Sequence, residues 1–310
     1  MEKIGFINLN KPTGITSHGA AQKLKKITGI RRIGHSGTLD PMASGVLVMA
    51  VGKATKLVEF LRKDDKTYEA VIRLGVTSDT YDATGQITET PPPVPIPSGA
   101  QIRSAIEQFA GEIEQMPPKF SAIKVKGTPA YKLARDGKEV ELKPRKVTIH
   151  EIKLVEFRHP LVSIKVKCSA GTYIRSIAHD LGQRLKTGAV LDALHRTQAG
   201  DFDIKDSVEL DDVTEENWQE YLLPVQAGVS HMEVFKADED TAQKVSRGIK
   251  VPVADKLAEG PIAIFGPKAE LLAIGEFDPD KKLLKPIKVL AAQTPLPPRD
   301  KPGPEQPQKD

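Results

Sequence analysis

Cysteine is nearly absent from this chain of 310 residues, which contains only Cys168. One cysteine cannot form a disulfide within the chain, and it excludes a metal site built on several thiolates. The seven histidines show no metal-ligand spacing either. We therefore expect no bound metal and a reducing, cytoplasmic setting.

Nucleotide-binding signatures and long hydrophobic runs are also missing from the sequence. It contains no Gly-Lys-Ser/Thr phosphate loop, and no Gly-x-Gly-x-x-Gly motif follows a strand-like run. We therefore expect no nucleotide cofactor. No run of 18 apolar residues occurs, so we expect no membrane-spanning helix.

Positive charge is unevenly distributed along the chain. The net charge is +4, but residues 117–146 alone carry nine basic and three acidic residues, a surplus of +6. We call residues 117–146 the basic segment. A second basic cluster, residues 23–32, precedes a glycine-rich loop. A charge run is most often only a solvated face. Two such runs favour a phosphate-rich partner.

One carboxylate, Asp40, stands alone in the loop of residues 34–47. Three glycines permit unusual backbone shapes there, and Pro41 disfavours a helical conformation at Asp40. An apolar run over 45–51 follows and is typical of a buried strand. Asp-Pro beside glycines is also ordinary turn chemistry, which is the commoner meaning of such a sequence. The alternative is a catalytic acid at the mouth of a central strand.

Arg175 is predicted to lie in the first turn of a helix that begins near Thr172. The helix dipole disfavours a cation there, so a carboxylate partner would explain it. If that partner is Asp40, the arginine would keep the acid ionised. A surface arginine is an equal alternative. Tyr68, at a strand edge, is more often a core residue but could stack on an unpaired base.

Strand-like and helix-like stretches are mixed along the first 228 residues. Strands are expected at 4–10, 45–51, 67–74 and within the alternating stretch 147–167, and helices at 17–28, 53–61, 98–109 and from 172. Residues 229–290 are β-rich, and residues 291–310 hold six prolines, which predicts a disordered tail. The basic segment shows little periodicity, which predicts a mobile surface insertion. The whole pattern predicts an α+β fold.

Six ordered motifs resemble the TruB family of bacterial tRNA pseudouridine-55 synthases. They lie within residues 7–17, 34–47, 78–85, 117–137, 171–175 and 194–197. The resemblance covers about residues 4–228 and, more weakly, 229–290. It implies a catalytic domain at 1–228 with a mixed, largely antiparallel sheet flanked by helices. The basic segment would be a thumb-like RNA-binding insertion, and 229–290 would be a PUA-like RNA-binding domain.

The resemblance also implies roles for individual residues. Asp40 would be the catalytic aspartate, Arg175 its ion-pair partner, Tyr68 a stacking platform for the target uracil, and Tyr173 a wall of the pocket. The residues expected to contact RNA are His35, Asp82, Lys119, Lys124, Lys126, Arg135, Leu194 and Arg196. The sequence departs mildly from the family pattern at Ser36, Met42 and Ser44. His195 stands at a position where the family more often has arginine.

The implied reaction isomerises uridine to pseudouridine at position 55 of the tRNA T loop, by base flipping and without a cofactor. The partner would be the tRNA T-arm, and nothing in the sequence demands more than a monomer. A lone aspartate can act as a nucleophile or as a base, and the sequence does not choose. The alternatives are a non-catalytic RNA-binding or tRNA-folding protein and, nearer, a guide-RNA-dependent synthase.

Overall fold

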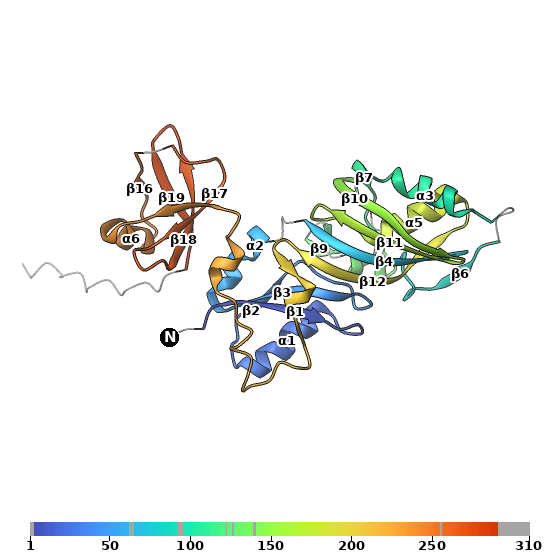
Figure 1. Cartoon of the computed structure of the whole chain (residues 1–310), viewed down its shortest axis with the longest axis horizontal. Coiled ribbons are helices and arrows are strands. Elements are labelled where there is room, and N and C mark those ends of the chain that lie inside the picture. The colour runs from blue at the N-terminus through green and yellow to red at the C-terminus, as the bar shows by residue number, and fades with distance from the viewer. Residues whose placement is uncertain are drawn as a thin grey trace, which may run out of the picture. The chain divides into compact units, whose positions relative to one another are not determined.

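The chain folds into two compact units, residues 1–228 and 229–310 (Figure 1). A computed structural model describes residues 3–61, 65–91, 96–121, 123–125, 127–138, 141–254 and 256–290. The proline-rich tail at 291–310 lies outside the described residues. Among the described residues, no helix is long and apolar enough to cross a membrane.

The first unit combines one large sheet with helices on one of its faces. Its strands are β1 (Gly5–Lys11), β2 (Ile33–Ser36), β3 (Ser44–Val51), β4 (Lys66–Leu74), β5 (Val76–Ser78), β6 (Ile87–Glu89), β7 (Gly111–Gln115), β8 (Lys124–Val125), β9 (Thr128–Pro129), β10 (Arg145–Arg158), β11 (Leu161–Cys168), β12 (Ala189–Ala199), β13 (Phe202–Asp203) and β14 (Val208–Glu209). Its helices are α1 (Ser17–Thr28), α2 (Val58–Leu61), α3 (Gly99–Glu107), α4 (Ala130–Arg135) and α5 (Ile174–Leu185), with 3₁₀ turns η1 (Gly52–Leu57), η2 (Ile204–Asp206) and η3 (Val225–Gly228).

The large sheet is mixed and mostly antiparallel. Its strand order is β14-β1-β3-β12-β4-β11-β10-β7, with β2 paired to β3 and β13 paired to β12. Only the β1–β14 and β3–β12 pairs of this sheet are parallel among the described residues. Strands β3 and β12, far apart in sequence, therefore lie side by side at the centre. The α+β class predicted from the sequence is confirmed.

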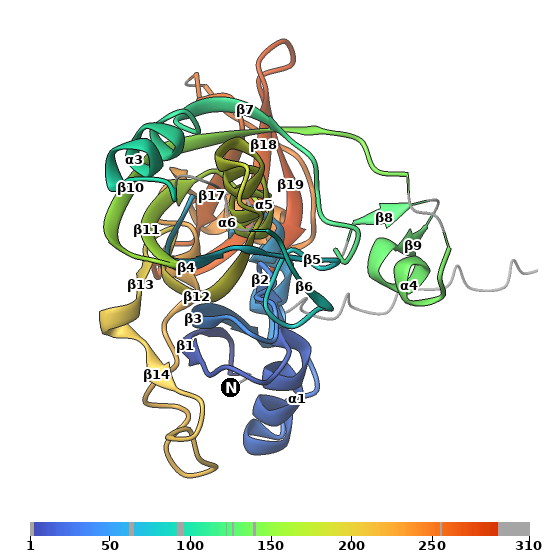
Figure 2. The ribbon, with the colours of Figure 1, turned by 90° about the vertical axis from the view of Figure 1, so that its right-hand side faces the viewer.

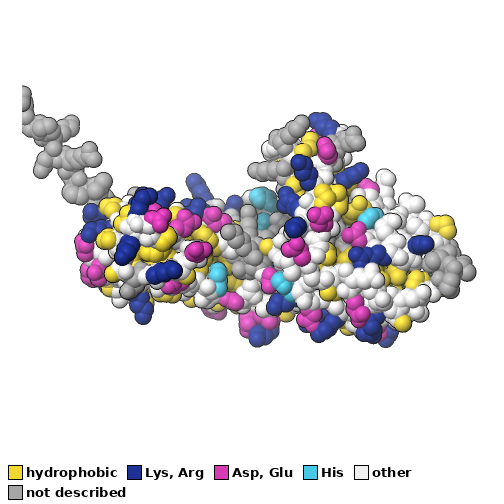
Figure 3. Space-filling view, turned by 90° about the horizontal axis from the view of Figure 1, so that it is seen from above, with side chains coloured by type: hydrophobic (Ala, Val, Ile, Leu, Met, Phe, Trp, Pro, Cys, Tyr) yellow, Lys and Arg dark blue, Asp and Glu magenta, His cyan; other side chains and the backbone are white. Residues whose placement is uncertain are grey.

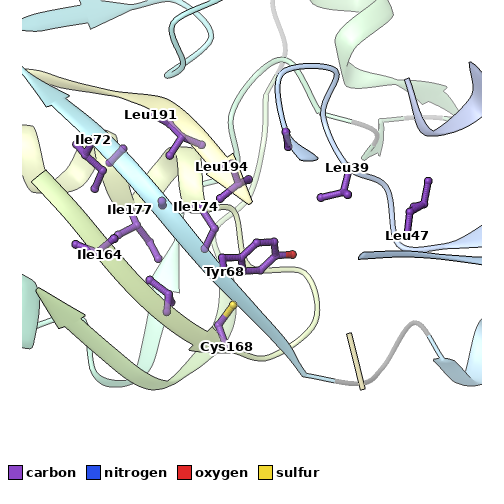
Figure 4. Close-up of a cluster of buried hydrophobic side chains, with 14 of the residues drawn as sticks. Leu39, Leu47, Tyr68, Ile72, Ile164, Cys168, Ile174, Ile177, Leu191 and Leu194 are labelled. Carbon is purple, nitrogen blue, oxygen red and sulfur yellow. The ribbon is translucent and has the colours of Figure 1, made fainter. Parts of the chain in front are cut away.

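Alternation along β4 and β11 places their buried side chains on one face of the sheet, whereas β3 is buried along nearly its whole length. On β4, Tyr68, Ala70 and Ile72 are buried, whereas the side chains between them are partly or fully exposed. Val162, Ile164 and Val166 of β11 are buried in the same way, as their period-two spacing predicted. Apolar side chains of α1, α3 and α5 complete one cluster with these strands. Figure 4 shows the part of it where Ile174 and Ile177 of α5 lie beside β4.

Local capping signals explain the ends of α1 and α3. Thr16 accepts a hydrogen bond from the Gly19 N–H at the start of α1, and Gly29 ends that helix with a positive φ of 68°. Ser98 and Gln101 form a reciprocal capping box at α3. The helix expected over 53–61 is mostly wrong. The 3₁₀ turn η1 occupies residues 52–57, and only residues 58–61 are α-helical.

The basic segment has more regular structure than its sequence pattern indicated. It forms a short β8–β9 hairpin followed by α4, and Figure 2 shows this group set apart from the large sheet. The buried Ala130 anchors the start of α4, where its N–H donates to the Ile123 carbonyl at 2.7 Å. Lys119, Lys132 and Arg135 are exposed.

The second unit is a small β-structure with one helix. It contains β15 (Glu233–Lys236), α6 (Glu239–Ser246), β16 (Val251–Pro252), β17 (Pro261–Phe265), β18 (Leu271–Asp278) and β19 (Leu283–Val289). These strands form one sheet in the order β15-β17-β18-β19-β16. Val245 of α6 and Ile264 of β17 are fully buried in its own core. The unit therefore has an independent hydrophobic cluster, as a separate domain does.

Candidate active site

Asp40 lies in the loop that joins β2 to β3, at the point where the chain enters the centre of the sheet. Gly45, the second residue of β3, has a φ of +102° and lies opposite Arg196 of β12. A Cβ atom at Gly45 would lie 2.2 Å from the carbonyl oxygen of Arg196, so no other residue fits without a shift of the backbone. This close approach fixes where the loop leaves the sheet.

The turn after β1 and the first residue of α1 also hold the Asp40 loop. The hydroxyl of Ser17 accepts a hydrogen bond from the Leu39 N–H at 2.8 Å and donates one to the Leu39 carbonyl at 3.0 Å. The Gly14 N–H donates to the Pro41 carbonyl at 2.8 Å. Both residues beside Asp40 in the chain are thereby tied to a second segment, which restricts the backbone that carries the carboxylate.

Lys11 shapes that supporting segment from inside the protein. The residue is fully buried, and its Nζ donates to the carbonyls of Pro12 at 2.7 Å and Ile15 at 2.9 Å. Burial lowers the pKa of Lys11 to about 8, and Asp40 opposes that change. The lysine therefore contributes both a local scaffold and a positive charge near Asp40.

Arg175 joins the Asp40 loop to three other segments. Its Nε lies 2.9 Å from Asp40 Oδ2, and its Nη2 donates to Asp40 Oδ1 at 3.2 Å. The same guanidinium donates to the carbonyls of Thr80 at 3.1 Å and Phe120 at 3.0 Å. The Arg175 side chain is 5% exposed. The two-atom contact to a carboxylate fixes the direction of the acid as well as its charge.

Asp82 is the second carboxylate beside Arg175. Its Oδ2 lies 3.4 Å from Arg175 Nη1, and its Oδ1 accepts hydrogen bonds from the hydroxyls of Thr80 at 2.7 Å and Thr84 at 2.6 Å. Its side chain is 5% exposed, whereas that of Asp40 is 33% exposed. Of the two acids, Asp40 is the one that remains open to solvent. From the sequence we expected Asp82 to contact RNA, and its contact with Arg175 was not predicted.

The pKa of Asp40 reflects opposing effects. Burial raises the pKa above its ordinary value, the Arg175 guanidinium opposes that rise, and the negative charge of Asp82 adds to it. From the sequence we expected Arg175 to keep Asp40 ionised. The geometry adds desolvation and a like charge, which shift the pKa in the other direction.

A cavity of about 840 Å³ adjoins Asp40 and is lined by aromatic and apolar side chains together with charged and hydroxyl groups. Tyr68 and Leu194 lie on neighbouring strands β4 and β12, and both line it (Figure 4). Burial raises the pKa of the Tyr68 phenol, which stays neutral. Tyr173, the N-cap residue of α5, also lines the cavity, and burial raises its pKa as well.

Arg196 is fully buried although it borders the same cavity. Its Nε donates to the Val46 carbonyl at 2.7 Å, and its Nη2 donates to the Gly37 carbonyl at 3.1 Å. These contacts hold both ends of the Asp40 loop. From the sequence we expected Arg196 to contact RNA, and its hydrogen bonds to the Asp40 loop were not predicted.

The residues expected to contact RNA do not all lie at one place. Arg135 lines the cavity, whereas Lys119 and His35 are not among its described lining residues. His35 is half-buried on β2. Lys124 belongs to β8, and Lys126 lies outside the described residues.

Two contacts of the site carried no signal in the sequence. The buried Gln115 of β7 accepts from the Tyr173 N–H at 2.7 Å and donates to the Tyr173 carbonyl at 2.9 Å. The Phe120 backbone carbonyl accepts from Arg175. A glutamine at a strand end and a main-chain oxygen are common features, so only the folded structure reveals them.

The described residues offer an acid and hydrogen-bonding groups but no metal-binding cluster. No group of three or more His, Cys, Asp or Glu side chains that could hold a metal ion occurs among them. The site therefore offers one solvent-accessible carboxylate, an arginine held in place beside it, and a cavity large enough for a planar ring.

Comparison with known sequences matches residues 25–230 to two consecutive family models. Residues 25–174 match the model of the TruB family pseudouridylate synthase N-terminal domain. Residues 175–230 match that of the tRNA pseudouridylate synthase B C-terminal domain. The boundary between these matches falls beside Arg175, so the ion pair with Asp40 joins the two.

Similar proteins are found among both curated sequences and solved structures. The chain is 40% identical to a tRNA pseudouridine synthase B of Clostridium tetani, over 88% of this chain and 95% of that protein. It is 38% identical to one of Bacillus pumilus, over 93% and 97%. An H/ACA ribonucleoprotein bound to a substrate RNA containing 2′-deoxyuridine includes a chain with a TM-score of 0.70 and 26% identity, covering 94% of this chain and 86% of that one. This protein belongs to the TruB family of pseudouridylate synthases.

Proposed function

We propose that this enzyme converts uridine to pseudouridine at position 55 in the T loop of tRNA, with Asp40 as the reacting acid. The observation that carries the proposal is the contrast between two carboxylates on one arginine. Both acids line the cavity, but the Asp82 side chain is only 5% exposed, whereas that of Asp40 is 33% exposed. A reacting group has to be both held and reachable, and Asp40 meets both conditions.

The reaction rearranges bonds within one nucleotide. The bond from N1 of the uracil to C1′ of the ribose breaks, and a bond from C5 to C1′ forms. The proton on C5 is lost, and N1 gains one, so the atoms balance without a further reactant. Asp40 serves either as a nucleophile toward the ribose or the base, or as a base at the sugar.

The cavity fits a base that has left its stack. Flipping a base out costs a few kcal/mol, and stacking on an aromatic ring returns about 1–3 kcal/mol. Tyr68 is the proposed stacking partner, with Leu194 and Tyr173 as further walls. The ring of Tyr68 is suited to this because it is buried in the cavity wall and needs little ordering when the base arrives.

Affinity for RNA is assigned to the basic segment and to the second unit. Exposed cations such as Lys119 and Lys132 would contact phosphates and give salt-dependent, largely sequence-independent binding. We propose that residues 229–290 act as a PUA-like RNA-binding domain. We also propose that the enzyme is a monomer and acts on tRNA in the cytoplasm.

Site mapping tests the proposal. The enzyme is incubated with an unmodified tRNA transcript, and pseudouridine is mapped along it. A single new pseudouridine at position 55, abolished when that uridine is replaced by cytidine, is the expected result. Pseudouridine at another position would refute the T-loop assignment. Binding without any pseudouridine would favour a non-catalytic tRNA-folding protein, and activity only with an added guide RNA would favour a guide-dependent synthase.

A further inference from the structure

Tyr81 has an unusual backbone conformation beside the arginine that holds Asp40. Its φ is +64°, in the left-handed region that bulky side chains rarely adopt. The other non-glycine residues with positive φ among the described residues are Lys186, Ala269 and Lys282. Tyr81 is thus the one aromatic residue described in this conformation. Such a conformation costs free energy and persists only when surrounding contacts hold it.

The neighbours of Tyr81 in the chain are both partners of Arg175. The carbonyl of Thr80 accepts from Arg175 Nη1 at 3.1 Å, and Asp82 Oδ2 lies 3.4 Å from the same nitrogen. The backbone at Tyr81 and Ala83 is also tied to β12. The Tyr81 carbonyl accepts from the Leu191 N–H at 3.0 Å, and the Ala83 N–H donates to the Leu191 carbonyl at 2.9 Å. These bonds fix the main chain but leave the ring of Tyr81 to another contact.

That contact is His179 of α5. The two rings are stacked, with centroids 3.9 Å apart and an angle of 13° between their planes. Burial lowers the pKa of His179 and raises that of Tyr81, so both rings are uncharged near neutral pH. The stack is therefore a contact between two neutral aromatic faces.

Helix geometry places this stack next to the ion pair. His179 follows Arg175 by four residues, so the two side chains lie on the same side of α5. Arg175 reaches Thr80 and Asp82, and His179 reaches the residue between them. The loop of residues 80–82 is consequently attached to α5 at two adjacent points. Rotation of the loop about the Arg175 contacts would have to break the stack.

We propose that the Tyr81–His179 stack is a positioning device for the Arg175–Asp82–Asp40 arrangement. This inference rests on the proposed role of Asp40 in the reaction. The stack holds the loop so that the Thr80 carbonyl and Asp82 meet the arginine at fixed distances. The arginine in turn presents Asp40 to the cavity in one direction. Neither ring touches the substrate, and their removal changes the rate through the arginine.

Four variants separate this role from a general effect on folding. Tyr81→Asn and His179→Ala remove the stack. Asparagine tolerates a positive φ, so Tyr81→Asn keeps the backbone conformation accessible. Tyr81→Phe keeps a ring of the same size and is the conservative variant. His150→Ala is the matched control, because His150 is a histidine on β10 that contacts Asp65 by a hydrogen bond and is distant in sequence from the stack.

The measurements are the single-turnover rate of pseudouridine formation at saturating tRNA, the Kd for tRNA and the thermal unfolding midpoint. For Tyr81→Asn and His179→Ala we expect a rate about tenfold lower, in keeping with the strength of an aromatic pair, and a Kd within about twofold. Tyr81→Phe should restore most of the rate. His150→Ala should match the parent in rate.

Two results would overturn the proposal. One is an unchanged rate in both stack-breaking variants. The other is a weakened Kd with an unchanged rate at saturation, which would make Tyr81 an RNA contact. Asp40→Asn, tested in parallel, keeps the two proposals apart. An active Asp40→Asn enzyme refutes the role of Asp40, whereas an inactive one beside fully active stack variants refutes only the positioning role.

Discussion

The surroundings of Asp40 and the basic segment use polar residues in opposite ways. Around Asp40 the charged side chains Lys11, Arg175 and Arg196 are buried, and each donates to backbone carbonyls. In the basic segment the described cations are exposed, and their charge is in surplus. Elsewhere on the face shown in Figure 3, cations and anions are interspersed. Buried groups joined by hydrogen bonds hold side chains in fixed positions. Exposed charges of one sign create an electrostatic potential around the segment. The first region should therefore govern the rate of reaction, and the second the affinity for RNA.

The largest expected effect comes from Arg175→Lys. Lysine keeps the positive charge but cannot make the two-atom contact with Asp40 together with the bonds to the Thr80 and Phe120 carbonyls. We expect the single-turnover rate to fall about a hundredfold or more, because misplacing a reacting group by about 1 Å has that effect. The Kd for tRNA should change by less than a few-fold.

Arg184→Lys is the matched control for that variant. Arg184 lies on the same helix, with its guanidinium 3.9 Å from the centre of the Phe109 ring and no contact with Asp40 among those described. Its replacement should leave the rate unchanged. An equal fall in rate in both variants would mean that α5 is simply sensitive to substitution.

A smaller effect is expected for Ser17→Ala. This change removes both hydrogen bonds to Leu39 and leaves two buried backbone groups without that partner. We expect about 1–3 kcal/mol lower unfolding free energy and a rate reduced about tenfold. Chemical denaturation and single-turnover assays measure the two effects.

Ser98→Ala provides the comparison for Ser17→Ala. Ser98 caps α3, so its replacement should lower stability by about 1 kcal/mol. Because it has no described contact with the Asp40 loop, the rate should remain that of the parent. A fall in rate in proportion to stability in both variants would argue against a special role for Ser17.

The pH dependence of the rate should show the raised pKa of Asp40. If the ionised acid reacts, activity falls as the pH drops through that pKa, so the acidic limb should lie above about pH 4, the ordinary range of an aspartate. In Asp82→Asn the like charge that raises the Asp40 pKa is absent, and the limb should move to lower pH. A limb that moves to higher pH would contradict the assigned electrostatics.

The smallest effect on the rate should come from the basic segment. Replacing Lys119, Lys132 and Lys143 by glutamine should leave the saturated single-turnover rate unchanged and weaken tRNA binding. The slope of log K against log salt should become shallower by about 0.7–0.9 for each phosphate that the variant no longer neutralises. Lys153, Lys165 and Lys167, which are exposed on the opposite face of the sheet from the core, form a control set of equal charge. An equal fall in affinity in both sets would show that total charge, not the basic segment, decides binding.

Short-range patterns in the sequence were sufficient for much of the fold. The helix expected over 17–28 matches α1, which Thr16 caps and Gly29 ends, and the alternation of Val162, Ile164 and Val166 gave the buried face of β11. The unfavourable place of Arg175 in the first turn of α5 correctly pointed to a carboxylate partner. Each of these signals depends on residues close in the chain or on a single electrostatic conflict.

Long-range contacts to the backbone could not be predicted in the same way. The bonds from Ser17 to Leu39 and from Arg175 to the Phe120 carbonyl join segments 22 and 55 residues apart. Their acceptors are main-chain oxygens that every residue possesses. The same reason explains Arg196, whose buried position depends on the pairing of β12 with β3 and not on its neighbours in the sequence.

The most direct test of the division between rate and affinity is Asp40→Asn, measured for both quantities on the same preparation. Asparagine keeps the size of the side chain and removes the charge that the buried site disfavours, so the fold should be retained. We predict no pseudouridine formation in a tRNA transcript and a Kd for that tRNA within a few-fold of the parent. Turnover retained by the Asp40→Asn enzyme would contradict the assignment of Asp40 as the reacting acid.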